Sequence, residues 1–228
     1  MAKFNPVVTT SLSVGLATGV YGISFGALSV TAGLDIWQTQ VLSLLMFSGG
    51  SQFAFVGVLA GAGLGGPAVG AAVVSAWLLG IRNGFYAVQL SPILAKVGLA
   101  KIIPALLTID ESTAVSSAQS QLSDKRRGFW LTGIAVFVFW NLMTLLGAVL
   151  GDAMGDPTAW GLDAAAAAAF LGLIWPRLRE RQAAAVAALA MLIAVLATPF
   201  LPAGLPILIS GSVAVLVGGL DIFKGGRK

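Results

Sequence analysis

Four long stretches of the chain contain no Asp, Glu, Lys or Arg, and they constrain the fold more than any other feature. They cover residues 4–34, 36–81, 128–151 and 182–220. A helix needs about 20 apolar residues to cross a hydrocarbon core of about 30 Å, and each stretch is long enough. The second and fourth have room for two helices each. Because lipid offers the backbone no hydrogen bonds, we expect helices and not open strands.

Composition places the chain among membrane proteins. Hydrophobic residues make up 57% of the 228 residues before Gly is counted, and charged residues make up only 10%. Soluble proteins carry about 25% charged residues, so this chain has too little polar material to cover a globule in water. We therefore expect residues 1–228 to form a single transmembrane domain surrounded by the lipid bilayer.

Two residue types are absent from the sequence, and this restricts its chemistry. Without Cys there are no disulfides or thiolate ligands, and without His the usual metal ligand and proton shuttle are missing. No phosphate-binding Gly-Lys-Ser/Thr loop and no HExxH motif occurs. We expect no enzyme activity, no metal and no cofactor. The net charge of +4 comes from basic clusters between apolar stretches, which indicates cytoplasmic loops and not nucleic-acid binding.

The predicted fold is an all-α polytopic bundle of seven or eight transmembrane segments. Its uncertain element is 98–122, which has basic residues at both ends and contains Pro104, Asp110 and Glu111. If both ends are cytoplasmic, this element is broken or re-entrant, the spans number seven and the N-terminus is external. If it crosses the membrane, there are eight spans and the N-terminus is internal. The other helices are predicted at about 8–32, 38–62, 68–94, 128–151, 163–176, 183–200 and 205–221.

A weak internal repeat accompanies this pattern. Gly26-Ala27-Leu28 stands at the same distance from Asp35 as Gly147-Ala148-Val149 stands from Asp156. Under the seven-span topology the two halves would be inverted in the bilayer, as in many secondary transporters.

Small residues recur every three or four positions along the first predicted helix, which places them on one face. Such a face lets another helix backbone approach closely, so tight helix packing is one interpretation. The other is that this smooth face lines a path or slides during a conformational change. The residues concerned include Gly15, Gly19, Gly22 and Gly26.

Gln52 lies within the second predicted helix, in the sequence FSGGSQF (47–53). A buried amide must find hydrogen-bond partners, so Gln52 either bonds a neighbouring helix or contacts a substrate. Gly49 and Gly50, just before it, favour local unwinding that would expose backbone carbonyls.

Arg82 lies deeper in its apolar segment than an end-anchoring charge should, in RNGFYAVQLSP (82–92). An Arg at mid-membrane costs about 2.5–3.5 kcal/mol, so we expect it to face the protein interior and pair with a carboxylate. The alternative is that it extends to the membrane interface. Asn83 and Tyr86 follow at helical spacing and indicate a polar surface, protein-facing or lined by water.

Asp110 and Glu111 are adjacent carboxylates in an otherwise apolar segment. With no His available, a carboxylate is the obvious proton carrier, and the pair is a candidate for a proton or substrate pathway. A structural ion pair with Arg82 or Lys101 is the competing interpretation. Asp163 precedes a run of six alanines and is predicted to cap a helix, with a place in the pathway as the alternative.

These motifs together resemble the AzlC family, the larger subunit of two-component branched-chain amino acid exporters. The resemblance covers most of the chain, and its departure is Ala164, where the family usually has an aromatic residue. It implies a secondary transporter subunit in the bacterial cytoplasmic (inner) membrane that exports branched-chain or similar apolar amino acids. It also implies proton coupling and a small AzlD-type membrane partner. The motifs are FSGGSQF (47–53), RNGFYAVQLSP (82–92), TIDES (108–112) and WGLDAAAAAAF (160–170).

Two other functions fit the same residues. A passive small-solute channel would also place a few polar groups inside an apolar bundle. A scaffold subunit that does not itself transport would suit the Gly-rich helix faces.

Overall fold

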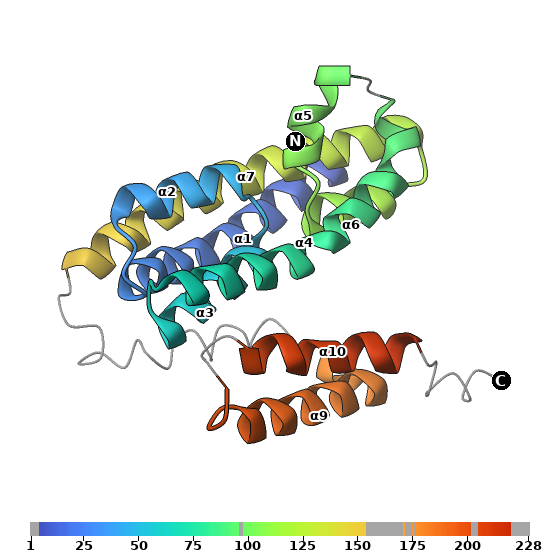
Figure 1. Cartoon of the computed structure of the whole chain (residues 1–228). Helices are drawn as coiled ribbons and strands as arrows, with labels where there is room; N and C mark the ends of the chain where they lie inside the picture. Colours follow the sequence, from blue (N-terminus) through green and yellow to red (C-terminus); the bar gives the residue numbers. More distant parts are fainter. Residues whose placement is uncertain are drawn as a thin grey trace.

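The computed structural model describes residues 5–95, 98–153, 171, 175, 177–201 and 205–219, and no strand occurs among them. Figure 1 shows the order of the helices along the chain. The helices are α1 (Pro6–Thr31), α2 (Ile36–Leu45), α3 (Gly49–Ala62), α4 (Gly66–Leu94), the 3-10 turn Gly98–Lys101, α5 (Ile102–Leu106), α6 (Asp110–Ser117), α7 (Leu122–Ala153), the 3-10 turn Arg177–Arg179, α9 (Arg181–Ala197) and α10 (Leu205–Gly219).

Three of the described helices, α1, α4 and α7, are long and apolar enough to cross a bilayer. They contain 26, 29 and 32 residues. The helices α9 and α10 are shorter, with 17 and 15 residues. The predicted helix at 163–176 falls largely outside the described residues. The membrane-protein prediction is therefore supported by three spanning helices, whereas a count of seven or eight is not.

The helices α1 and α7 lie side by side and run in the same direction (Figure 1). Near their starts, Oγ1 of Thr132 donates to Oγ of Ser11 over 2.9 Å. Further along, Gly26 lies directly against the backbone of Gly147. The register is constant from one end of the pair to the other, so both helices begin on the same side of the bundle.

The glycines of α1 form the contact with α7. A Cβ added to Gly15 would lie 2.6 Å from Cβ of Ala135, and one added to Gly19 would lie 2.5 Å from Cβ of Phe139. Such distances leave no room for a side chain at these positions. Glycine therefore allows the backbones of α1 and α7 to touch. Gly22 and Gly26 face α7 in the same way. The stripe therefore packs against α7, and none of these four residues lines the cavity described below.

The segment 36–62 is not one helix, and the prediction for 38–62 is wrong. Nε2 of Gln52 lies 3.4 Å from the carbonyl oxygens of Leu42 and Ser43. In a continuous helix, residues ten positions apart would be separated by about 15 Å. The chain therefore turns back at 46–48, and α2 and α3 form a hairpin. Ser48, Gly49 and Gly50 are weak helix formers, which makes this position the natural break.

A second hairpin follows α4. Nε of Arg126, near the start of α7, donates to the carbonyl oxygen of Ile93 at the end of α4 over 2.6 Å. The two ends of 98–122 therefore meet on one side of the bundle. Between them α5 leads inward, 107–109 forms the tip, and α6 leads back along α7, where Val115 lies against Gly128. This geometry matches the re-entrant alternative for 98–122 and not the crossing one.

Two hairpins change the expected topology. Because 36–62 also turns back, α1 and α7 begin on the same side, so the external N-terminus of the seven-span prediction does not fit. The predicted inverted relation between 26–35 and 147–156 is also wrong, because α1 and α7 are parallel, and Asp156 lies outside the described residues. Instead, the order helix, hairpin, helix occurs twice along the chain, first from α1 to α4 and then from α4 to α7. The two repeats share α4 and run in opposite directions.

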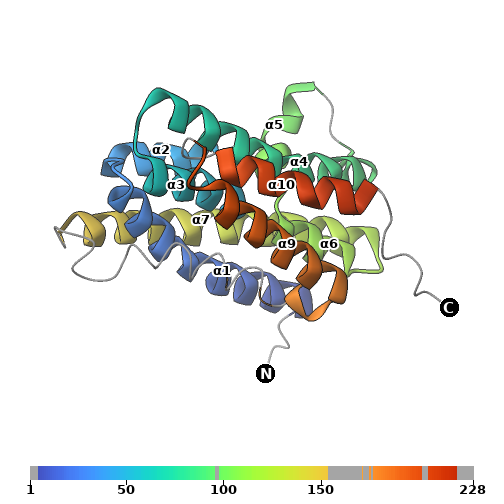
Figure 2. The ribbon, with the colours of Figure 1, turned by 60° about the horizontal axis from the view of Figure 1, so that its bottom comes forward.

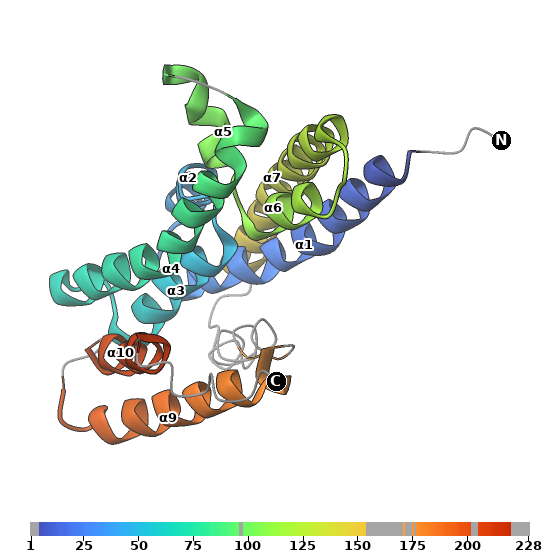
Figure 3. The same ribbon diagram turned by 90° about the vertical axis from the view of Figure 1, so that its right-hand side faces the viewer.

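The helices α9 and α10 pack against each other and form a pair beside this core (Figure 3). The contact of α10 with the core is made along α4, as the turned view in Figure 2 also shows. The pair takes no part in lining the cavity.

Candidate functional site

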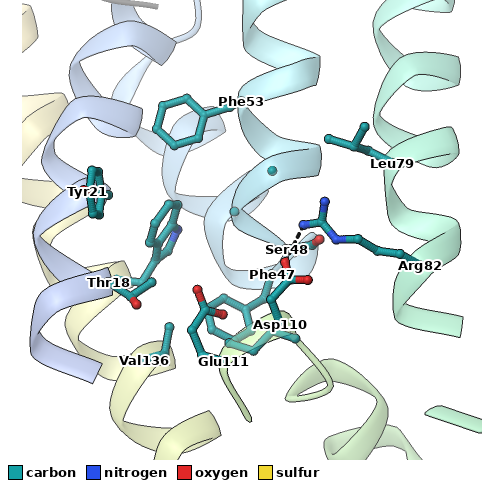
Figure 4. Close-up of a pocket in the computed structure, with 14 residues that line it drawn as sticks. Thr18, Tyr21, Phe47, Ser48, Phe53, Leu79, Arg82, Asp110, Glu111 and Val136 are labelled. Atoms are coloured by element: carbon teal, nitrogen blue, oxygen red, sulfur yellow. Dashed lines mark ion pairs between the residues drawn. The ribbon is translucent and has the colours of Figure 1, made fainter. Parts of the chain in front are cut away.

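A cavity of about 390 Å³ lies where the two hairpin tips meet between α1, α4 and α7 (Figure 4). The tips reach it from opposite sides of the bundle, and each contributes the start of a helix. The lining residues are Thr18 and Tyr21 of α1, Phe47 to Gly50 and Phe53 of the first hairpin, Leu79 and Arg82 of α4, Ile109 to Glu111 of the second hairpin, and Val136 and Trp140 of α7.

Arg82 and Asp110 form an ion pair at the wall of this cavity. Nη2 of Arg82 lies 2.7 Å from Oδ2 of Asp110, and the two side chains are 33% and 42% exposed. The hydroxyl of Tyr86 donates to the other carboxylate oxygen, Oδ1, over 2.7 Å. The predicted pairing of Arg82 with one of the two carboxylates is confirmed for Asp110. Arg82 therefore faces the cavity, where it meets its carboxylate partner.

Helix α4 holds both hairpin tips. Nδ2 of Asn83 donates to Oγ of Ser48 at the first tip over 3.1 Å. One turn further, Tyr86 reaches the second tip through Asp110. The guanidinium of Arg82 lies against Gly50 of the first tip and pairs with Asp110 of the second. The polar surface predicted for 82–89 is thus the side of α4 that fixes the two tips relative to each other.

The start of α3 presents bare backbone N–H groups to the cavity. The side chain of the N-cap residue, Ser48, makes no hydrogen bond to the backbone N–H groups of the first turn, and its Oγ lies 3.1 Å from Oγ of Ser51 instead. The first N–H groups of a helix have no partner within it and carry partial positive charge. Gly49 and Gly50 both line the cavity. A Cβ on Gly50 would lie 2.8 Å from Nη2 of Arg82, so the guanidinium rests against this helix start. Two positive groups therefore lie together.

The start of α6 presents carboxylates instead. Asp110 and Glu111 occupy its first turn, where acidic residues stabilise the helix dipole. Oγ of Ser112 donates to the carbonyl oxygen of Leu107 over 2.6 Å and fixes the tip. Figure 4 shows Asp110 pointing toward Arg82 and Glu111 pointing toward Thr18 of α1.

Glu111 differs from Asp110 in its partners. In the described part of the chain the ion pairs are Arg82 with Asp110 and Arg127 with Asp124, so Glu111 has none. Thr18 of α1 lines the cavity together with Glu111. Since Arg82 and Asp110 offset each other, Glu111 is the carboxylate of the cavity that lacks a cationic partner. Of the two adjacent carboxylates, Asp110 forms the predicted ion pair with Arg82.

Aromatic side chains close the apolar part of the cavity. The rings of Phe53 and Trp140 meet edge to face at 6.2 Å, and Phe25 stacks behind Trp140 at 6.0 Å. Tyr21 lines the cavity from α1. None of these was predicted as a site residue, because an aromatic residue inside an apolar span gives no sequence signal of its own.

Gln52 does not line the cavity. It is fully buried, and its amide donates to the last carbonyl groups of α2. Of its two predicted roles, the interhelical hydrogen bond is the one present. Asp163 lies outside the described residues.

Comparison with protein-family models shows to which family this chain belongs. The family model described as AzlC protein matches residues 13–154, which is more than half of the chain and includes every residue that lines the cavity. The chain belongs to the AzlC family. AzlC proteins are associated with membrane transport, are not known as enzymes and function in a complex with a partner subunit. Searches of curated proteins and of solved structures found no match.

Proposed function

We propose that this AzlC protein exports branched-chain or similar apolar amino acids across the bacterial cytoplasmic membrane in exchange for protons, together with a small AzlD-type subunit. The observation that carries the proposal is the pair of unlike hairpin tips. A positive group on one side of the cavity and an unpaired carboxylate on the other match the two charges of a zwitterion.

The substrate carboxylate is assigned to the first tip. A guanidinium has five N–H donors, so Arg82 can pair with Asp110 and still bind a second carboxylate. Its position against Gly50 adds the bare N–H groups of the α3 start to the same site. Broken helices in secondary transporters bind substrate carboxylates in this way.

The substrate ammonium is assigned to Glu111, and the apolar side chain to the aromatic wall. Phe53 and Trp140 line the cavity with their aromatic rings, and the buried indole Nε1–H of Trp140 has no hydrogen-bond partner among the described residues. The cavity volume lies within the range of about 300–1,000 Å³ that is usual for small-molecule sites.

Glu111 also supplies the coupling. A protonated carboxyl group binds an ammonium poorly, so proton binding and substrate binding compete at Glu111. A proton that arrives from the acidic outside would displace the substrate there. Deprotonation inside would restore the site, and the cycle exchanges one proton for one amino acid.

The orientation follows from the charged residues at the helix ends. Lys125, Arg126 and Arg127 lie at the start of α7, and the positive-inside rule places that side in the cytoplasm. The N-terminus of α1 is then cytoplasmic as well. Asp35 and Asp152 lie at the opposite ends of α1 and α7, facing the outside.

The test is efflux of labelled Leu, Ile, Val and Met from cells that express the chain with and without its small partner. We expect efflux only with the partner, and we expect a protonophore to abolish it. Efflux that follows the solute gradient and ignores the protonophore would indicate a passive channel. Equal efflux from cells that contain the partner alone would indicate that this chain is a scaffold.

A further inference from the structure

A second cavity lies beside the end of α4, apart from the cavity that holds Arg82 and Glu111. It has a volume of about 270 Å³ and shares none of its described lining residues with the first cavity. One wall is formed by the last turns of α4, and the other by α5 and the 3-10 turn before it. We call it the α4–α5 groove, and its lining includes Val88, Leu90 and Leu94 of α4 and Lys101, Pro104 and Ala105 of the second hairpin.

The α4–α5 groove combines an apolar wall with one cationic group. Among its described lining residues Lys101 is the one that carries a charge, and the neutral polar residues are Ser91 and Thr108. Oγ1 of Thr108 already donates to a backbone carbonyl group over 2.7 Å. In the described part of the chain the ion pairs are those of Arg82 and Arg127, so Lys101 has no carboxylate partner there. The groove therefore offers a ligand one unpaired positive charge and an apolar surface.

The surface around the groove is apolar and exposed, as expected where a protein meets acyl chains. Leu99, Ile102 and Ile103, on both sides of Lys101 in the sequence, are 85%, 62% and 62% exposed. Val88, in the wall of the groove, is 74% exposed. Exposed apolar side chains grouped in this way mark a surface that contacts a membrane or a partner. Helix α5 projects away from the other helices and packs mainly against the 3-10 turn before it (Figure 3), so the groove separates α5 from α4.

The groove lies on the basic side of the bundle. The end of α4 meets the start of α7 through the bond from Arg126 to Ile93, next to Lys125 and Arg127. The positive-inside rule places such a cluster in the cytoplasm. The cytoplasmic leaflet carries anionic lipids, and basic pockets between helices on this side bind their headgroups. A ligand with an anionic head and an apolar chain is therefore the one that matches both the lining and the position of the groove.

We infer that the α4–α5 groove binds one anionic phospholipid of the cytoplasmic leaflet. The phosphate of the lipid pairs with the ammonium group of Lys101, and one acyl chain lies between the last turns of α4 and α5. The groove extends to Thr108, and the next residues, Ile109 and Asp110, line the first cavity. The lipid therefore supports α5 and the tip that follows it, whichever solute the first cavity takes.

The experiment is thermal unfolding of the purified full chain in a neutral detergent, titrated with phosphatidylglycerol or with phosphatidylcholine of the same acyl chains. Phosphatidylglycerol is expected to raise Tm by about 5 °C with saturation, because a ligand of the folded state stabilises it by mass action. Phosphatidylcholine should raise Tm much less, since its headgroup has no net charge. Inorganic phosphate alone should have no effect. Lys101→Gln should abolish the difference between the two lipids, and Lys101→Arg should keep it.

A second variant tests the place of the acyl chain. Ala105 is exposed and lines the groove, so Ala105→Trp should fill it, leave Lys101 in place and abolish the shift.

The matched control is Lys125→Gln. Lys125 lies on the same side of the bundle, forms no ion pair with a described residue and is not among the described lining of the groove. Its response to phosphatidylglycerol should equal that of the unaltered chain. The inference is overturned if both lipids give the same Tm, if phosphate alone gives the full shift, or if Lys101→Gln or Ala105→Trp keeps it. An equal loss in Lys125→Gln and Lys101→Gln would also overturn it, because it would indicate a general attraction of anionic lipids to the basic side.

Discussion

The two hairpin tips reach the same cavity from opposite sides, yet they present opposite charges to it. The first tip is Ser48-Gly49-Gly50, which is small, neutral and uncapped, so the positive end of α3 and the guanidinium of Arg82 dominate. The second tip begins α6 with Asp110 and Glu111. Two helix starts of similar geometry thus become an anion site and a cation site. The difference lies in which side chains occupy the first turn.

Removing Arg82 should break this asymmetry most completely. In Arg82→Ala the first tip loses its fixed cation, and efflux should fall by about 100-fold or more, since deleting one partner of a charged pair costs about 2–5 kcal/mol in binding. Stability should fall less, because both side chains of the pair are partly exposed. Efflux assays and thermal unfolding of the same preparation measure the two effects.

Exchanging the charges sharpens the same point. The double variant Arg82→Asp with Asp110→Arg should recover the Tm lost in either single reversal, because the ion pair forms again. It should not recover efflux, because the cation then belongs to the second tip. Recovery of efflux in the exchanged protein would show that the position of the charge does not matter.

A smaller change at the first tip tests the approach of Arg82 to the start of α3. In Gly50→Ala the new Cβ displaces the guanidinium, and efflux should fall by about tenfold, because a shift of about 1 Å in a binding group is costly. Gly61→Ala is the matched control, since Gly61 lies in the same helix and a Cβ there meets nothing within 4 Å. Equal efflux from both variants would remove Gly50 from the site.

The smallest expected effect concerns the attachment of the first tip to α4. Asn83→Ala removes the 3.1 Å hydrogen bond to Oγ of Ser48. A neutral hydrogen bond contributes about 1 kcal/mol, so efflux should fall by about fivefold. Gln89→Ala removes a comparable bond to Ser117 away from the cavity and should leave efflux unchanged. A similar fall in both variants would point to a general loosening of α4.

The charged half of the site could be predicted from sequence, because an ionised side chain in an apolar segment must find a partner. That argument led to Arg82 and the Asp110/Glu111 pair. The basic residues around 98–122 left two alternatives for this segment, a re-entrant element or a crossing helix. The first hairpin has no such signal. Residues 36–81 contain no charge, so hydropathy reports the length of apolar chain and not its direction.

The aromatic wall was missed for a related reason. Trp140 and Phe53 lie in apolar spans, where lipid contact and cavity lining require the same residue types. The wrong side predicted for the N-terminus has the same origin. The reversal of the chain at 46–48 was not recognised, and one missed reversal moves the N-terminus to the other side of the bundle. Gly49 and Gly50 were predicted to unwind and expose backbone carbonyls, but both are helical and begin α3 directly after the break at 46–48.

The most direct test of the central claim is proton-driven exchange in liposomes that contain the chain and its partner. Uptake of labelled Leu is measured with and without an imposed pH gradient for the unaltered chain, Glu111→Gln and the exposed control Glu180→Gln. The unaltered and control proteins should respond to the gradient, whereas Glu111→Gln should remain folded and show no response. A gradient response that persists in Glu111→Gln would contradict the account.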